Sequence, residues 1–192
     1  TRLREALGVG VAEQLEWANE WQGWRAWRGA VDKSGVLVFQ FAGVPLEEVR
    51  GVALPHMPLP VVGVNSKEFP ESRSFTLLHE LVHLMLLNGK EEAPALEEHR
   101  SAVEWNTVEQ FAESAASHAL IPENVLEEQL ERLGLVHAEW SLDEVRRLAP
   151  RFRVTPKAAA TRLRTSGLMG STAYFEWLAN WNAYVAMLPA RK

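Results

Sequence analysis

The chain contains no cysteine, which excludes both a disulfide framework and a thiolate metal site. Any bound metal must therefore be held by histidine and carboxylate side chains. The sequence also has no unbroken apolar run of the roughly 20 residues that a membrane-spanning helix needs. Its first residues lead into no apolar stretch of the signal-peptide kind. These absences favour a cytoplasmic protein with no membrane contact.

A strong positive charge is absent as well, because the 192 residues carry a net charge of −5. No global attraction to nucleic acid is expected, although a local basic patch could still bind it. An apolar fraction of 47% with 23% charged residues is typical of a globular protein with a real core. The length predicts one main domain with a small appended part.

The most informative stretch is the apolar run 77–87, which contains two histidines and a glutamate. His79 and His83 are four residues apart, and this spacing places both imidazoles on one face of an α-helix. The pair can bind one Zn²⁺, with Glu80 placed to act on a water held at the metal. Burying three ionisable groups unpaired would cost several kcal/mol each, so a shared divalent cation is the favoured explanation.

A catalytic zinc site usually takes three protein ligands and leaves one position open. The helix predicted over 102–120 offers Glu109 on a face with the small residues Ala112 and Ala116, which would let two helices approach closely. We therefore predict Glu109 as the third ligand. Glu113, one turn later, is placed to accept the Nδ1–H of a ligand histidine. His118 falls on another side of this helix and is predicted to be structural.

Three segments of the sequence carry a family resemblance. Phe75-Thr76 precedes His79, the second helix reads Glu109-x-x-Ala-x-x-Ala-Ala and ends in Leu-Ile-Pro, and a helical segment follows from Phe152 to Leu163. Over about residues 30–168 the chain resembles the ImmA/IrrE family of metallopeptidases, a gluzincin-like group. It departs from the family pattern at two positions, where Ala115 replaces a usual Phe and Glu113 replaces an Asn or Asp.

The resemblance implies an α+β fold with a zincin-like metallopeptidase core, built from a small β-sheet and active-site helices. The expected parts are a core over 1–122, a helical, helix-turn-helix-like subdomain over 123–170, and a C-terminal amphipathic helix over 171–192. It implies a metalloendopeptidase that cleaves a helix-turn-helix transcriptional repressor and so relieves repression in a stress or mobile-element response. Zn²⁺ is the expected metal, with Mn²⁺ and Fe²⁺ as alternatives.

A second hypothesis is a DNA-binding regulator whose metal site is structural. Residues 141–166 carry a local net charge of +5, and two helices joined by a short turn could grip a duplex. The competing interpretation is a helical subdomain whose basic side chains stay solvated or hold the repressor. The basic residues concerned are Arg146, Arg147, Arg151, Arg153, Lys157, Arg162 and Arg164.

The remaining local patterns predict helices over 1–29, 75–87, 102–120, 123–133, 141–149 and 172–187, another from Pro156 with Thr155 as its cap, and strands over 36–41 and 61–65. Ser72 or Ser74 is expected to cap the metal-binding helix, and residues 43–60 to form loop and extended chain. The tryptophans at 17, 21, 24 and 27 are expected to face the core.

Three choices stay open at the level of the sequence. The strand over 61–65 is either a sheet edge that binds substrate by strand addition or an ordinary internal strand. The acidic stretch 90–104 is either a solvated loop or a rim that faces a basic substrate. The candidates for the group that stabilises the oxyanion are His99, His137, Arg73 and Tyr174.

Overall fold

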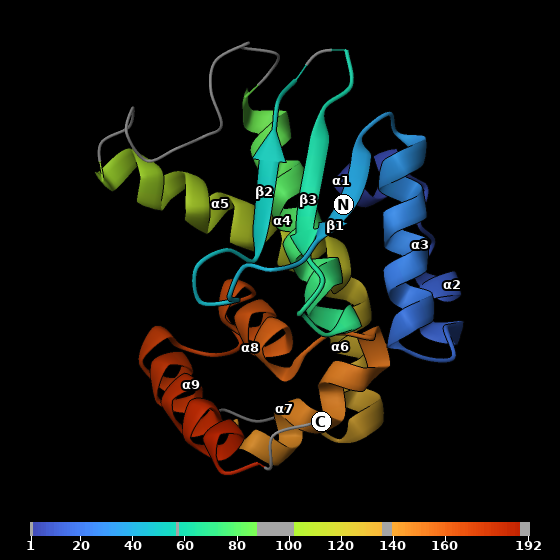
Figure 1. Cartoon of the computed structure of the whole chain (residues 1–192). Helices are drawn as coiled ribbons and strands as arrows, with labels where there is room; N and C mark the ends of the chain where they lie inside the picture. Colours follow the sequence, from blue (N-terminus) through green and yellow to red (C-terminus); the bar gives the residue numbers. More distant parts are fainter. Residues whose placement is uncertain (1, 57, 88–101, 136–139, 189–192) are drawn as a thin grey trace.

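The computed structural model describes residues 2–56, 58–87, 102–135 and 140–188, with the backbone alone over 102–105. The fold is mixed α+β, with a small sheet and many helices (Figure 1). The elements are α1 (Arg2–Leu7), α2 (Val11–Glu16), α3 (Glu20–Lys33), β1 (Leu37–Phe41), β2 (Gly51–Leu54), β3 (Val61–Asn65), α4 (Pro70–Leu87), α5 (Ala102–Leu120), α6 (Glu123–Leu133), α7 (Leu142–Leu148), the 3₁₀ turn η2 (Ala149–Phe152), α8 (Pro156–Thr165) and α9 (Ser171–Ala186).

The three strands are arranged in the order β1-β3-β2. β3 pairs in parallel with β1, from Leu37 opposite Val61 onward, and antiparallel with β2, where Gly51 lies opposite Val64. Because β3 has a hydrogen-bonded neighbour on each side, its backbone cannot add a further strand. The interpretation of 61–65 as a substrate-binding edge is therefore wrong, and among the described residues the outer strands of this sheet are β1 and β2.

One face of the sheet is buried under helices. Val38, Ala53, Val62 and Val64 point to this side and are almost fully buried, whereas Phe39 on the other face is exposed. α4 packs against β2 and β3, α3 packs against α4 and β1, and α5 lies against α4. Figure 1 shows α4 directly behind the strands, so the predicted metal-binding helix lies between the sheet and α5.

The N-terminal stretch predicted as helical forms α1, α2 and α3. Trp17, Trp24 and Trp27 are buried in the core, as expected, but Trp21 is 46% exposed with the Arg73 guanidinium over its ring. The prediction assumed that all four tryptophans lie on one helix. Trp17 instead precedes α3, so the four side chains do not share one helical face, and Trp21 is left on the exposed side.

α4 begins at Pro70, five residues before the predicted start. Ser74 therefore lies inside the helix, where its hydroxyl donates to the Pro70 carbonyl, and Ser72 is also a helical residue. Neither serine caps the helix, so that prediction is wrong. The predicted bounds of α5 and α6 are confirmed, and Thr155 caps α8 by accepting from the Ala158 N–H, with Pro156 at the first position.

The helices after α5 pack on the same continuous cluster of buried side chains that contains Trp17 and Trp177. The boundaries at 122 and 170 stay a prediction. No helix among the described residues is long and apolar enough to cross a membrane. The acidic stretch 90–104, His99 and His137 lie outside the side chains that the structure describes.

Candidate metal centre

The structure brings His79, His83 and Glu109 together, as the sequence predicts. The two Nε2 atoms lie 3.0 Å apart on one face of α4. Glu109 on α5 reaches both of them, with Oε2 3.2 Å from His79 Nε2 and Oε1 3.1 Å from His83 Nε2. Ala112 and Ala116 on α5 are fully buried, which is consistent with their predicted role in close helix packing.

The geometry of these three residues fits a metal ion. Ligand atoms at the 2.0–2.1 Å bond lengths of a tetrahedral zinc site are about 3.3 Å apart, close to the separations of 3.0–3.2 Å found here. His83 is buried and His79 is largely covered, so the imidazoles need a partner for their Nε2 atoms. Two imidazoles and one carboxylate suit Zn²⁺ best among the divalent metals.

The pKa values of Glu109 and His79 reflect how closely the three side chains lie. Hydrogen bonds from His79 and His83 lower the pKa of Glu109 to about 2, against an ordinary value of 4.5. Burial disfavours the charged form of His79, but the hydrogen bond to Glu109 and the negative charges of Glu80, Glu109 and Glu113 outweigh it, so that the pKa of His79 is raised. Without a metal, the cluster therefore attracts a positive charge in the form of a proton.

Glu80, the predicted catalytic base, lies on the side of α4 that faces β2. A Cβ atom placed on Gly51 would lie 2.8 Å from Glu80 Oε1, so the strand backbone runs directly beside this carboxyl group. Burial is the main cause that raises the pKa of Glu80 above 4.5, and the charges of Glu109 and Glu68 add to it, although both histidines act in the opposite direction. A raised pKa suits a group that must take up and release a proton near neutral pH.

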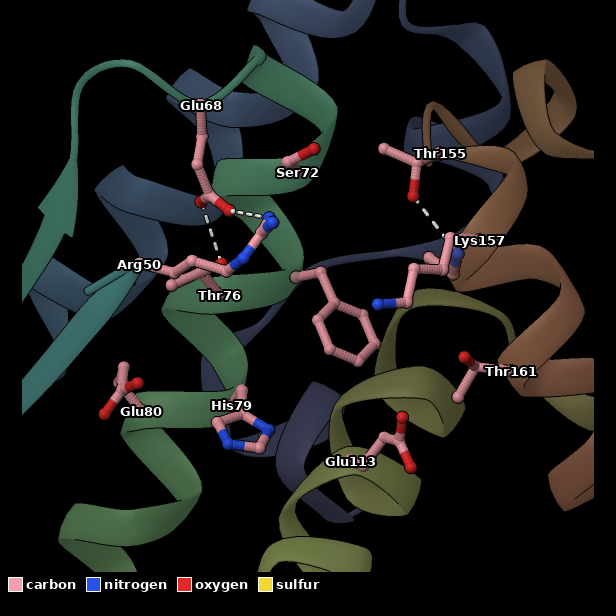
Figure 2. A pocket seen from close by; sticks show the side chains of 12 residues that line it. Arg50, Glu68, Ser72, Thr76, His79, Glu80, Glu113, Thr155, Lys157 and Thr161 are labelled. Atoms are coloured by element: carbon pink, nitrogen blue, oxygen red, sulfur yellow. Dashed lines mark hydrogen bonds and ion pairs between the residues drawn. The ribbon is translucent and has the colours of Figure 1, made fainter. Parts of the chain in front are cut away.

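The ligand candidate His79 and Glu80 line a cleft of about 250 Å³ between α4, α5, the start of β2 and the N-terminal end of α8 (Figure 2). Phe75 lies within it, and its ring stacks on His79 with centroids 6.2 Å apart. The other lining residues are Arg50, Glu68, Ser72, Thr76, Glu113, Thr155, Lys157, Ala158 and Thr161. A substrate chain could approach the metal ligands through this cleft.

Glu113 lines the cleft, but its carboxylate is held by another group. Its Oε2 accepts a hydrogen bond from the Arg164 guanidinium at 2.6 Å, and that guanidinium also lies over the Tyr174 ring at 4.4 Å. His79 Nδ1 is buried and has no hydrogen-bond partner in the described part of the chain. The predicted bond between Glu113 and a ligand histidine thus stays a prediction.

Sequence reasoning missed a buried carboxylate at one end of the cleft. Glu68 is 4% exposed, accepts from Thr76 Oγ1 at 2.8 Å and pairs with Arg50 at 3.1 Å. Burial raises its pKa above 4.5 despite these partners. The only available signal was Thr76 in the Phe-Thr pair, since nothing in the sequence around Glu68 distinguishes it from an ordinary turn residue.

Arg73, Tyr174 and His118 are engaged in other contacts. Arg73 donates to Glu68 O, Gln40 and Ser66 O, so all three of its nitrogens are engaged outside the cleft. The Tyr174 hydroxyl is buried and bonded to Thr161 Oγ1. His118 Nδ1 lies 2.8 Å from the Ser114 carbonyl, which agrees with a structural role.

Comparison with known proteins indicates a family of metallopeptidases. The peptidase M78 family, described as the IrrE N-terminal-like domain, matches residues 31–164. Over 108 residues the chain is 37% identical to the radiation response metalloprotease IrrE of Deinococcus radiodurans. That match covers 48% of this chain and 30% of the relative, so the chain spans less than a third of that protein. Because the family match includes all three candidate ligands and more than half of the chain, the protein belongs to the M78, IrrE-like family of metallopeptidases.

Proposed function

We propose that the chain is a zinc-dependent, site-specific endopeptidase with a zincin-like core. The observation that carries the proposal is the convergence of His79, His83 and Glu109 on one point at separations of 3.0–3.2 Å, beside a buried Glu80 and an open cleft. A bound Zn²⁺ would lower the pKa of a water molecule and polarise the scissile carbonyl. Mn²⁺ or Fe²⁺ could occupy the same ligands.

The residues of the chain supply positioning and proton transfer. The pairing of His79 and His83 with Glu109 fixes the two imidazoles before substrate arrives. Glu80 takes a proton from the attacking water and delivers it to the leaving amine. β2 covers one side of Glu80, and this burial keeps the pKa of its carboxyl group raised, which suits a group that both accepts and returns a proton.

The substrate we propose is a helix-turn-helix repressor, whose cleavage relieves repression of stress-response or mobile-element genes. The support is the family resemblance together with the relative from Deinococcus radiodurans, whose name describes a radiation response metalloprotease. A cleft that is open on one side suits a protein substrate.

The experiment is incubation of the purified, zinc-loaded protein with helix-turn-helix repressors from the same genome, followed by mass spectrometry of the products. We expect one main cleavage that stops when a chelator is added and returns with Zn²⁺. Glu80→Gln should abolish cleavage while metal content, measured by plasma mass spectrometry, stays near one ion per chain. Cleavage that persists in Glu80→Gln contradicts the base assignment, and cleavage that persists in chelator contradicts a metallopeptidase.

The contacts of the basic segment do not favour the DNA-binding alternative. Arg162 is fully buried and donates to the Ile121 carbonyl, and Arg153 donates to the Trp17 carbonyl. Arg164 is held by Glu113, and Arg151 donates to Gln129 Oε1. Guanidinium groups in such contacts are not free to follow a phosphate backbone. Electrophoretic binding to duplex DNA that falls steeply with salt would restore this alternative.

A further inference from the structure

One cation in the cleft has no partner among the described residues. Arg50 pairs with Glu68 at 3.1 Å, and Glu113 pairs with Arg164 at 2.6 Å. Lys157 also lines the cleft, and within the described part of the chain it makes no hydrogen bond or ion pair through its ammonium group. Its positive charge is therefore available to a ligand that enters the cleft.

Lys157 lies in the same cleft as the metal-ligand candidate His79. Lys157 is the second residue of α8, and Figure 2 shows its side chain extending from that helix into the cleft toward α4. Phe75, which also lines the cleft, stacks its ring on the metal-ligand candidate His79. Lys157 and His79 thus line the same cleft, and an extended peptide advances about 3.3 Å per residue. A side chain within one to three residues of the scissile bond could reach Lys157.

The charged groups near Lys157 do not neutralise its ammonium, which can therefore attract an anion. The carboxylates of Glu68 and Glu113 are already paired with arginines. Glu80 lies on the β2 side of α4, beside Gly51, and not on the α8 side. The N-terminal end of α8, which begins at Pro156, adds the positive end of a helix dipole to the charge of Lys157.

We propose that Lys157 forms a subsite for a substrate carboxylate, so that the enzyme prefers Asp or Glu at one position within three residues of the bond it cuts. The inference rests on the proposed peptidase function and adds a specificity to it. The ammonium binds the carboxylate, while Phe75 and Ala158 provide apolar surface for the methylene groups of the acidic side chain. A C-terminal carboxylate has the same chemistry, and the test separates the two sources.

The first arm of the test measures cleavage. Zinc-loaded protein is incubated with mixtures of internally quenched peptides that carry Asp, Asn, Glu, Gln or Lys at each position around the cleaved bond, with amidated or free C-termini. We expect a preference of about fivefold for Asp over Asn or Glu over Gln at one position, as a partly exposed ion pair would give. Lys157→Gln should abolish this preference, and Lys157→Glu should change it to a preference for Lys. Lys33→Glu, an exposed charge reversal at the end of α3, is the matched control.

The second arm measures binding without catalysis. Fluorescence anisotropy of labelled acidic and amide-matched peptides is recorded with zinc-loaded Glu80→Gln, alone and combined with Lys157→Gln. We expect the acidic peptides to bind about fivefold more tightly, and only when Lys157 is present. A preference seen only with a free C-terminus would identify the terminal carboxylate as the ligand and overturn the side-chain subsite.

The two arms distinguish failure of this inference from failure of the proposed function. Cleavage without a carboxylate preference, or with a preference unchanged by Lys157→Gln, overturns the subsite and leaves the peptidase in place. Lys157-dependent binding of acidic peptides without any cleavage supports the subsite and contradicts the peptidase. If the protein shows no cleavage and no charge-dependent binding, both the subsite and the peptidase function are overturned.

Discussion

Gly51 on β2 lies against the catalytic-base candidate Glu80 on α4. A Cβ atom added at Gly51 would lie 2.7 Å from Glu80 Cγ, 2.8 Å from Glu80 Oε1 and 2.5 Å from Thr76 Cγ2. Carbon atoms in proteins do not approach so closely, so any side chain at this position would displace Glu80, Thr76 or the strand. The absence of a side chain on Gly51 therefore sets where the Glu80 carboxyl group can lie.

We predict that Gly51→Ala lowers kcat by about a hundredfold, because a displacement of about 1 Å in a reacting group can have an effect of this size. The two histidine ligand candidates on α4 meet Glu109 of α5 rather than β2, so zinc content should stay near that of the unchanged protein. Peptide cleavage kinetics and plasma mass spectrometry of the purified variant measure the two quantities.

The matched control is Gly29→Ala in α3, where an added Cβ meets no atom within 4 Å. Alanine is the better helix former, so this variant should gain about 0.5–1 kcal/mol of stability and keep full activity. An active Gly51→Ala variant would show that Glu80 does not need the space that the glycine leaves.

The candidate metal centre could be predicted from the sequence because its pattern lies within two short helical segments. The spacing of His79 and His83 fixes their common helical face in any α-helix. The small residues Ala112 and Ala116 mark the face of α5 that meets α4, and Glu109 lies on that face. The helical spacing of the two histidines and the close packing allowed by small residues were therefore sufficient to find all three ligand candidates.

The other parts of the site depend on contacts between distant segments, which a single sequence does not encode locally. β2 lies in a proline-rich stretch and is a strand because β3 pairs with it. The same pairing makes β3 internal, which no local pattern could decide. Arg164 meets Glu113 only because α8 packs on α5, 51 positions apart in the chain. The burial of Glu68 likewise follows from tertiary packing.

Glu109 and Glu113 of α5 should differ in their effect on metal binding. Glu109→Gln removes a charge that lies within 3.2 Å of both imidazoles, so zinc affinity should fall by more than about a hundredfold. Glu113→Gln should lower affinity by less than about tenfold, because its carboxylate is bonded to Arg164. Competition with a chromophoric chelator measures both values. Equal losses in the two variants would place Glu113 among the groups that hold the metal or its histidines.

Arg162 should be a structural residue of the basic segment. Its side chain is fully buried, donates to the Ile121 carbonyl at 2.7 Å and pairs with Glu123 at 3.2 Å. Arg162→Ala leaves a cavity and a carbonyl without its donor, so we expect a loss of at least about 3 kcal/mol in the free energy of unfolding. The control Arg132→Ala, which removes an exposed pair with Glu128, should cost less than about 1 kcal/mol. Urea unfolding curves give both values, and a small loss for Arg162→Ala would contradict the structural role.

The buried carboxyl group of Glu68 should make stability depend on pH in a specific direction. Burial raises its pKa above the ordinary 4.5, so the folded state binds a proton more readily than the unfolded state. The stability contributed by this proton is fully present below pH 4.5 and is lost as the pH rises through the folded pKa. Glu68→Gln has no such titration and keeps an uncharged side chain beside Thr76.

We therefore expect the free energy of unfolding of Glu68→Gln, relative to the unchanged protein, to increase as the pH is raised from 4.5 toward 8. Urea unfolding in chelator at four pH values measures this difference. The exposed Glu176→Gln exchange in α9 alters the net charge by the same amount and serves as the control. A relative stability of Glu68→Gln that decreases with rising pH would mean that Arg50 and Thr76 stabilise the charged carboxylate more than burial disfavours it.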